Sequence, residues 1–173
     1  QEKLESCINS DLANNYGNLC QRVLAFCEKN ANLEVPAIED LTEEDKIILN
    51  QYTKYYDNLI MYSDNQDVNS YINFIVEQLF SANKYFNDQE PWKKKDDQIR
   101  LNTIVYTTLE IVRKISLLLY PIMPDTSLKV LSMFDISEKK IEFSTIVNNN
   151  YLKGGKKINK IDILFKKIEN NND

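Results

Sequence analysis

Four stretches of the chain place apolar side chains at steps of three and four residues, the spacing that one face of an α-helix requires. These stripes run over residues 8–26, 48–62, 68–86 and 101–119. Only 3 glycines and 4 prolines interrupt the 173 residues, which favours long helices over many short strands. The sequence therefore predicts an all-α fold, in which short loops join four long helices into an antiparallel bundle.

Residues between the stripes carry the signals of helix ends. Thr42 and Asp45 are spaced as a capping box, and Asp67 is placed to cap the third helix. Pro124 is suited to the first turn of a short fifth helix, which we expect to run through Met133.

The character of the chain changes after residue 134, which predicts two units, 1–134 and 135–173. The first is the α-helical bundle. The second is a mixed, polar segment with a Gly154–Gly155 turn, many lysines and an apolar pair at Leu164 and Phe165. We interpret it as a linker and an extended or hairpin-like C-terminal arm that packs back on the rest of the protein.

Catalysis is not expected of this chain by itself. It contains no histidine, which removes histidine acid–base chemistry, His-dependent nucleophiles and His-containing metal sites. Neither the G-x-x-x-x-G-K-[ST] loop nor the G-x-G-x-x-G turn occurs. The carboxylates are scattered over the helical faces that we predict to meet solvent, so we expect no cofactor and no metal site.

The cysteines and termini point to a reducing, cytoplasmic setting. Cys7, Cys20 and Cys27 are an odd number of thiols in one predicted helix, without a C-x-x-C pair. No apolar run reaches the roughly 18 residues that span a membrane. The first residues lack the pattern of a secretory signal and an initiator methionine, which suggests a piece of a longer chain.

The first predicted helix carries a polar stripe beside its apolar one. Asn14, Asn18 and Arg22 follow each other at steps of four and therefore share one side of the helix. Asparagine amides and the arginine fork suit the hydrogen-bonding edges of nucleic-acid bases. The simpler interpretation is a solvated rim of an ordinary packed helix.

The only tryptophan, Trp92, lies in a polar corner between two predicted helices and is followed by Lys93, Lys94 and Lys95. An exposed indole can stack on a nucleic-acid base, and nearby lysines attract phosphate. The simpler interpretation is a hydrophobic plug at the end of the bundle. The net charge of −5 argues mildly against a nucleic-acid partner, although lysines cluster at 93–95, 153–160 and 166–167.

Four segments, in order and over nearly the whole chain, resemble the C-terminal anticodon-binding domain of bacterial methionyl-tRNA synthetase. They are "INSDLANNYGNLCQR" (8–22), "NKYFNDQEPW" (83–92), "LLYPIMPDTS" (118–127) and "LKGGKKINKIDILFKKIE" (152–169). The last departs from the family pattern, because Lys166 stands where the family usually has proline.

The resemblance implies that the chain recognises the CAU anticodon of methionine tRNA. Trp92 would stack on the wobble cytosine, and Asn18 and Arg22 would read base edges. Independently of the resemblance, the polar stripe and the corner predict secondary RNA contacts for Asn14, Lys93, Lys94 and Lys95.

The parent enzyme that the resemblance implies is a methionine–tRNA ligase that uses ATP and Mg²⁺. Its catalytic domain, with H-I-G-H and K-M-S-K-S elements, is absent from this chain. The C-terminal arm could pack on that domain as well as on the bundle. Since the chain stops at the arm, we expect a cytoplasmic monomer with no membrane contact.

Two alternatives stay open. One is the helical anticodon domain of another class I synthetase, such as the cysteinyl or isoleucyl enzyme. The other is a helical protein-interaction module that binds a partner through the tyrosine-rich face of the second predicted helix.

Overall fold

Helices make up nearly all the regular structure of the computed structural model, which describes residues 2–162, with side chains from residue 10 onward. The all-α prediction is confirmed. The elements are α1 (Glu2–Asn30), α2 (Glu43–Lys54), α3 (Tyr56–Asp64), α4 (Val68–Gln89), η1 (Pro91–Lys93), α5 (Gln98–Leu119), α6 (Pro124–Leu131), η2 (Ser132–Phe134), η3 (Glu138–Lys140) and η4 (Phe143–Val147).

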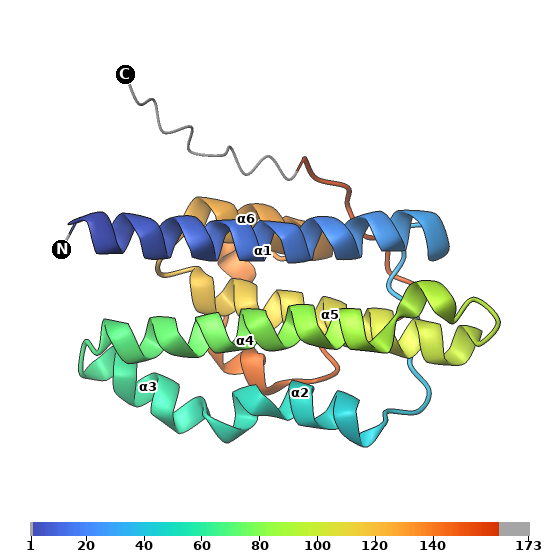
Figure 1. Cartoon of the computed structure of the whole chain (residues 1–173), viewed down its shortest axis with the longest axis horizontal. Coiled ribbons are helices and arrows are strands. Elements are labelled where there is room, and N and C mark those ends of the chain that lie inside the picture. The colour runs from blue at the N-terminus through green and yellow to red at the C-terminus, as the bar shows by residue number, and fades with distance from the viewer. Residues whose placement is uncertain (1, 163–173) are drawn as a thin grey trace.

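Helix α5 forms the centre of the molecule. It contacts α1, α2, α4 and α6, and in Figure 1 α1 and α6 lie along one side of α4 and α5, with α2 and α3 along the other. Every residue of α5 from Thr103 to Leu119 is buried. A helix enclosed on all sides by other elements buries its whole circumference rather than one stripe. None of the helices in the described part is long and apolar enough to cross a membrane.

Three of the predicted helix starts are confirmed. The Thr42 hydroxyl accepts a hydrogen bond from the amide of Asp45, and the Asp45 carboxylate accepts one from the amide of Thr42, which completes the capping box. Asp67 caps the first turn of α4. Pro124 begins α6, which ends at Leu131, two residues before the predicted end, and continues as a 3-10 turn.

The second predicted helix is interrupted at Tyr55, where one turn separates α2 from α3. The Tyr55 ring packs against Phe74 with centroids 5.6 Å apart, while the Tyr56 ring stacks on Phe143 at 6.0 Å. Neighbouring tyrosines thus face different elements. The sequence gives no sign of this break, because no glycine or proline occurs there and the apolar stripe continues through Tyr55.

The segment after α6 returns across the bundle and pairs with the linker that follows α1. The amide of Val35 donates to the carbonyl of Lys156, the amide of Gly155 to the carbonyl of Val35, and the amide of Ile158 to the carbonyl of Leu33. Gly155 has a φ of +84°, a conformation that side chains disfavour and glycine adopts readily.

One isolated bridge, between residues 34 and 157, completes this pairing, so the strand partner of residues 155–158 is the linker rather than a second half of the arm. The apolar pair Leu164–Phe165 and Lys166 lie outside the described residues.

Candidate nucleic-acid interface

A groove of about 440 Å³ runs between α1 and α4. Residues at helical spacing on each side form it: Asn15, Asn18, Gln21 and Arg22 from α1, and Val76, Phe80, Asn83 and Asn87 from α4. Five of these side chains are carboxamides and one is cationic. The groove therefore offers many planar donors and acceptors and contains no acidic group among its lining residues.

Arg22 lines this groove and is held by two contacts. Its guanidinium carbon is 5.1 Å from the centroid of the Phe86 ring, in a cation–π contact. The same guanidinium donates a hydrogen bond to the side-chain oxygen of Asn87 on α4. Since a guanidinium has five N–H donors in a rigid fork, this one hydrogen bond leaves donors for a further partner.

Trp92 is anchored at one edge and open elsewhere. Glu90 adopts a left-handed conformation, with φ +45°, and Pro91 is buried at the start of the 3-10 turn. The Trp92 ring meets Phe86 at a centroid distance of 6.1 Å and an angle of 61°, and 41% of the residue remains exposed. Both interpretations of Trp92 therefore hold in part. The indole packs against the Phe86 ring, as a hydrophobic plug would, while much of its surface is exposed to solvent.

Phe86 joins the two predicted recognition side chains. It is only 2% exposed and is itself held against Phe26 at 5.9 Å. Arg22 and Trp92, distant in sequence, contact this one ring. Asn18 is exposed and lines the adjoining groove. The structure therefore brings Asn18, Arg22 and Trp92 to one end of the α1–α4 surface.

The remaining predicted contacts lie at the edges of this surface. Asn14 is exposed but does not line the groove, where Asn15 lies instead. Lys93 forms an ion pair with Glu90 at 2.9 Å, Lys94 is half-buried and Lys95 is exposed. Carboxylates at positions 88, 90, 96 and 97 surround the three lysines in sequence, so the corner is not a strongly basic patch.

A buried carboxylate holds the corner that carries Trp92. Asp45 is fully buried and accepts two hydrogen bonds from the guanidinium of Arg100, at 2.6 and 3.1 Å, and one from the hydroxyl of Tyr85. Arg100 also donates to the side-chain oxygen of Gln89 at 2.7 Å. Burial alone would raise the pKa of Asp45, but the hydrogen bonds that it accepts hold this pKa below its ordinary value. The ends of α2, α4 and α5 are thereby joined.

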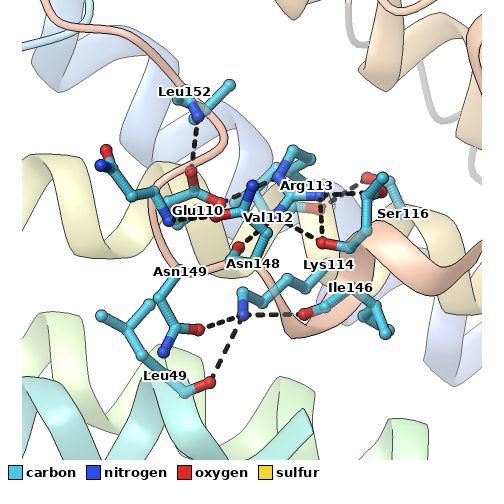
Figure 2. A network of polar contacts seen from close by, with 12 residues as sticks. Leu49, Glu110, Val112, Arg113, Lys114, Ser116, Ile146, Asn148, Asn149 and Leu152 are labelled. Carbon is cyan, nitrogen blue, oxygen red and sulfur yellow. Dashed lines mark hydrogen bonds and ion pairs between the residues drawn. The ribbon is translucent and has the colours of Figure 1, made fainter. Parts of the chain in front are cut away.

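A second buried polar network lies away from the groove, where α5 meets residues 145–152 (Figure 2). Glu110 pairs with Arg113 at 2.8 Å and accepts a hydrogen bond from the amide of Leu152. These side chains lie inside the molecule, so the prediction that the carboxylates all face solvent is wrong for Glu110 as it is for Asp45. Their partners are other parts of the fold.

Lys114 completes this network. Its ammonium donates to the carbonyl oxygens of Ile146, at 2.8 Å, and Leu49, at 3.4 Å, and to the side chain of Asn149 (Figure 2). Burial, reinforced by the nearby Arg113 charge, lowers the pKa of Lys114 to about 7. Within residues 2–162 there is also no group of three or more acidic or cysteine side chains that could hold a metal ion.

Comparison with known proteins decides between the alternatives. Residues 35–173 match the family described as the anticodon binding domain of methionyl tRNA ligase. The chain belongs to this family. It is 34% identical to the methionine–tRNA ligase of Thermotoga maritima over 98% of its own length, and 34% identical to that of Mycobacterium leprae over 84%.

Solved structures agree with the family. The chain is similar to Mycobacterium tuberculosis methionyl-tRNA synthetase in complex with methionyl-adenylate, with a TM-score of 0.83 and 30% identity over 94% of this chain. The apo form of that enzyme matches with a TM-score of 0.81 over 92% of this chain. The chain spans about a third of those structures and 27–28% of the Thermotoga and M. leprae relatives.

Proposed function

We propose that this member of the methionyl-tRNA ligase anticodon-binding family binds the anticodon stem-loop of methionine tRNA and reads its CAU sequence. One observation carries the proposal: Arg22 and the exposed Trp92 contact the same buried ring, Phe86, beside a groove of carboxamides. Single-stranded bases are recognised by stacking on aromatic rings together with hydrogen bonds to their edges. This surface offers both within one site.

Each side chain has a distinct role in the proposal. Trp92 stacks on the wobble cytosine, and base stacking on an aromatic side chain contributes about 1–3 kcal/mol. Arg22, oriented by Asn87, presents its fork to acceptor atoms of a base, and Asn18 pairs with an edge through its amide. Lys94 and Lys95 add phosphate attraction, whereas Asn14 and the ion-paired Lys93 contribute less.

The chain would act as one part of a methionine–tRNA ligase. The ATP- and Mg²⁺-dependent joining of methionine to tRNA would take place in the catalytic domain of the parent enzyme, in the cytoplasm, and this chain would deliver tRNA selectivity to it. The chain would divide into the helical bundle, residues 1–134, and a linker with a C-terminal arm, residues 135–173, that packs back on the bundle or on the catalytic domain.

The tyrosine-rich face does not favour the protein-interaction alternative. Tyr52 is fully buried, and Tyr55 and Tyr56 pack against Phe74 and Phe143. These rings already belong to the core and its margin.

Binding to a CAU anticodon stem-loop, compared with a loop altered only at the wobble base, tests the proposal. The measurement uses low salt and the fluorescence of Trp92, the only tryptophan. We expect quenching by the CAU loop and about 10-fold weaker binding of the altered loop, because a different base no longer matches the side chains that hydrogen-bond to base edges. Equal and salt-sensitive binding of both loops would contradict base-specific recognition.

Trp92→Phe and Trp92→Ala complete this experiment, with labelled RNA as the reporter. The phenylalanine variant keeps a stacking ring and should retain much of the affinity. The alanine variant should lose about 10-fold on the CAU loop.

A further inference from the structure

Phe80 on α4 is 71% exposed, more than any other large apolar side chain in the described part of the chain. An exposed phenylalanine forgoes much of the stabilisation that burial of its side chain would contribute. Single exposed apolar residues are common on protein surfaces, so exposure alone is not informative. The surroundings of Phe80 are informative, because this side chain lies in the α1–α4 groove beside Val76 and Asn83.

The position of Phe80 places it on the same side of α4 as Asn87, which orients Arg22. The two residues are seven apart, which is two helical turns or about 10 Å along the axis. Nucleotides in a stacked strand advance by about 3.4 Å each, so a strand along the groove covers this span in about three steps. Asn87 holds Arg22, which shares the Phe86 ring with Trp92, so a strand that passes this end of the groove can continue along α4 to Phe80.

The charge of the groove fits a strand of RNA. Arg22 is the one charged side chain among the eight that line it, in a chain with net charge −5. A polyanion approaching here meets a local positive charge and neutral amides, with no carboxylate among the lining side chains. Asn15, Asn18 and Asn83 lie around the same groove as Phe80 and can bond to base edges.

We propose that Phe80 is a second stacking platform, which takes a base of the anticodon loop other than the one on Trp92. This inference rests on the proposed function and extends it from one base to a strand laid along α4. Trp92 and Phe80 bind separate bases of one single strand, and the amides between them read edges. Phe80 thereby adds affinity and fixes the direction in which the loop crosses the groove.

Phe80→Ala, measured with labelled CAU stem-loop, tests the platform. We expect about 10-fold weaker binding, the effect of one lost stacking contact. Phe80→Tyr keeps the ring and should stay within about 2-fold of the unmodified chain. Ile47→Ala is the matched control, because Ile47 is 61% exposed on α2, outside the groove, and should not change binding. Thermal unfolding of each variant shows that the fold is kept.

A set of stem-loops with one abasic nucleotide at each loop position identifies the base. At one position other than the wobble base, the abasic loop should bind the unmodified chain and Phe80→Ala equally, because the contact is already absent. Quenching of Trp92 at saturation should persist in Phe80→Ala. If Phe80→Ala weakens binding by the same factor with every abasic loop, the proposed platform is wrong, since Phe80 would then contact no particular base.

Failure of the platform and failure of the proposed function give different results. If Trp92→Ala weakens CAU binding and Phe80→Ala does not, the platform is wrong and the proposed function stands. If CAU and altered loops bind equally, the proposed function fails. Single-stranded oligo(U) then tests the platform alone, which holds if Phe80→Ala weakens binding and falls if it does not. If Phe80→Ala binds every RNA as tightly as the unmodified chain does, the inference is wrong, and a protein partner becomes the alternative ligand of this surface.

Discussion

The guanidinium of Arg22 on α1 donates a hydrogen bond to the side-chain oxygen of Asn87 on α4, across 65 residues of sequence. With the Phe86 ring below it, this bond fixes the plane of the guanidinium. A planar fork that is already oriented loses little conformational entropy when it binds a base. Asn87 is thus a positioning residue for Arg22.

Asn87→Ala should weaken binding of the CAU stem-loop about 5-fold, because Arg22 loses its partner and must be ordered by the RNA. Stability should change by less than about 0.5 kcal/mol, since Asn87 is exposed. RNA titration and thermal unfolding measure the two effects. Asn73→Ala, an exposed asparagine of α4 outside the groove, is the control. A lost affinity equal in both variants would show that Asn87 has no special role.

Arg22→Lys should reduce discrimination between CAU and altered loops about 10-fold while leaving much of the total affinity. Lysine keeps the charge but presents a point cation in place of a fork. The dependence of binding on salt concentration should therefore stay nearly unchanged. Titrations of both loops at several salt concentrations check this. If Arg22→Lys leaves the discrimination between the two loops unchanged, Arg22 contacts phosphate instead of a base.

Asp45→Asn should lower the free energy of unfolding by about 3 kcal/mol, because it leaves Arg100 without its charged partner. The pKa of Asp45 is lowered by folding, so its charge stabilises the protein above about pH 4, the ordinary aspartate pKa. That contribution disappears as the pH falls through the lowered value. Urea unfolding at pH 7 and at pH 3 should therefore show a large difference between unmodified chain and variant at pH 7 and a smaller one at pH 3.

The same variant also tests whether this ion pair supports the corner that carries Trp92. Trp92 fluorescence in the folded Asp45→Asn variant should shift toward that of a more exposed indole, while Glu43→Gln, which removes an exposed carboxylate of α2, should leave it unchanged.

Lys114→Met tests the buried ammonium. Its pKa of about 7 in the folded chain lies below the ordinary value near 10.4, so only the unfolded chain holds the extra proton between these limits. Stability from this group therefore rises with pH from about 7 to 10 and is constant below 7. Relative to Lys114→Met, the unmodified chain should gain on the order of 2 kcal/mol between pH 7.5 and 9.5.

Chemical denaturation of both proteins across that range is the measurement. The buried thiols of Cys20 and Cys27, whose pKa values burial raises, oppose the trend above pH 8. They are common to both proteins and cancel in the comparison. Parallel curves for the two proteins would contradict a lysine that becomes neutral in the folded chain.

Most of the helical framework could be predicted from the sequence, because apolar spacing, capping residues and prolines are local signals. Thr42, Asp67 and Pro124 mark helix starts by their own chemistry. The turn at Tyr55 could not be predicted, since it depends on rings that lie far away, Phe74 and Phe143. Tertiary packing overrides local helix preference there.

The sequence predicts only part of the candidate site. Spacing and context predict Asn18, Arg22 and Trp92, but the contact of Arg22 and Trp92 with one ring, Phe86, depends on the folded arrangement of α1 and α4. Phe80 and Asn87 follow the same side of α4 as Val76 and Asn83, and this second stripe beside the apolar one was a usable signal. Buried ionic groups such as Glu110 gave no such sign, because their partners lie far along the chain.

The pairing of residues 33–35 with 155–158 closes the chain into a ring. Along the chain, helices α2 to α6 belong to the segment between the paired residues, whereas α1 precedes it. Helix α1 nevertheless carries Asn18 and Arg22. Contiguous segments of a protein can open as separate cooperative units, which native-state amide exchange detects. An RNA that bridges α1 and α4 would therefore slow amide exchange along α1 more than in α2 to α6. Binding in the groove would thus also stabilise the packed position of the first helix.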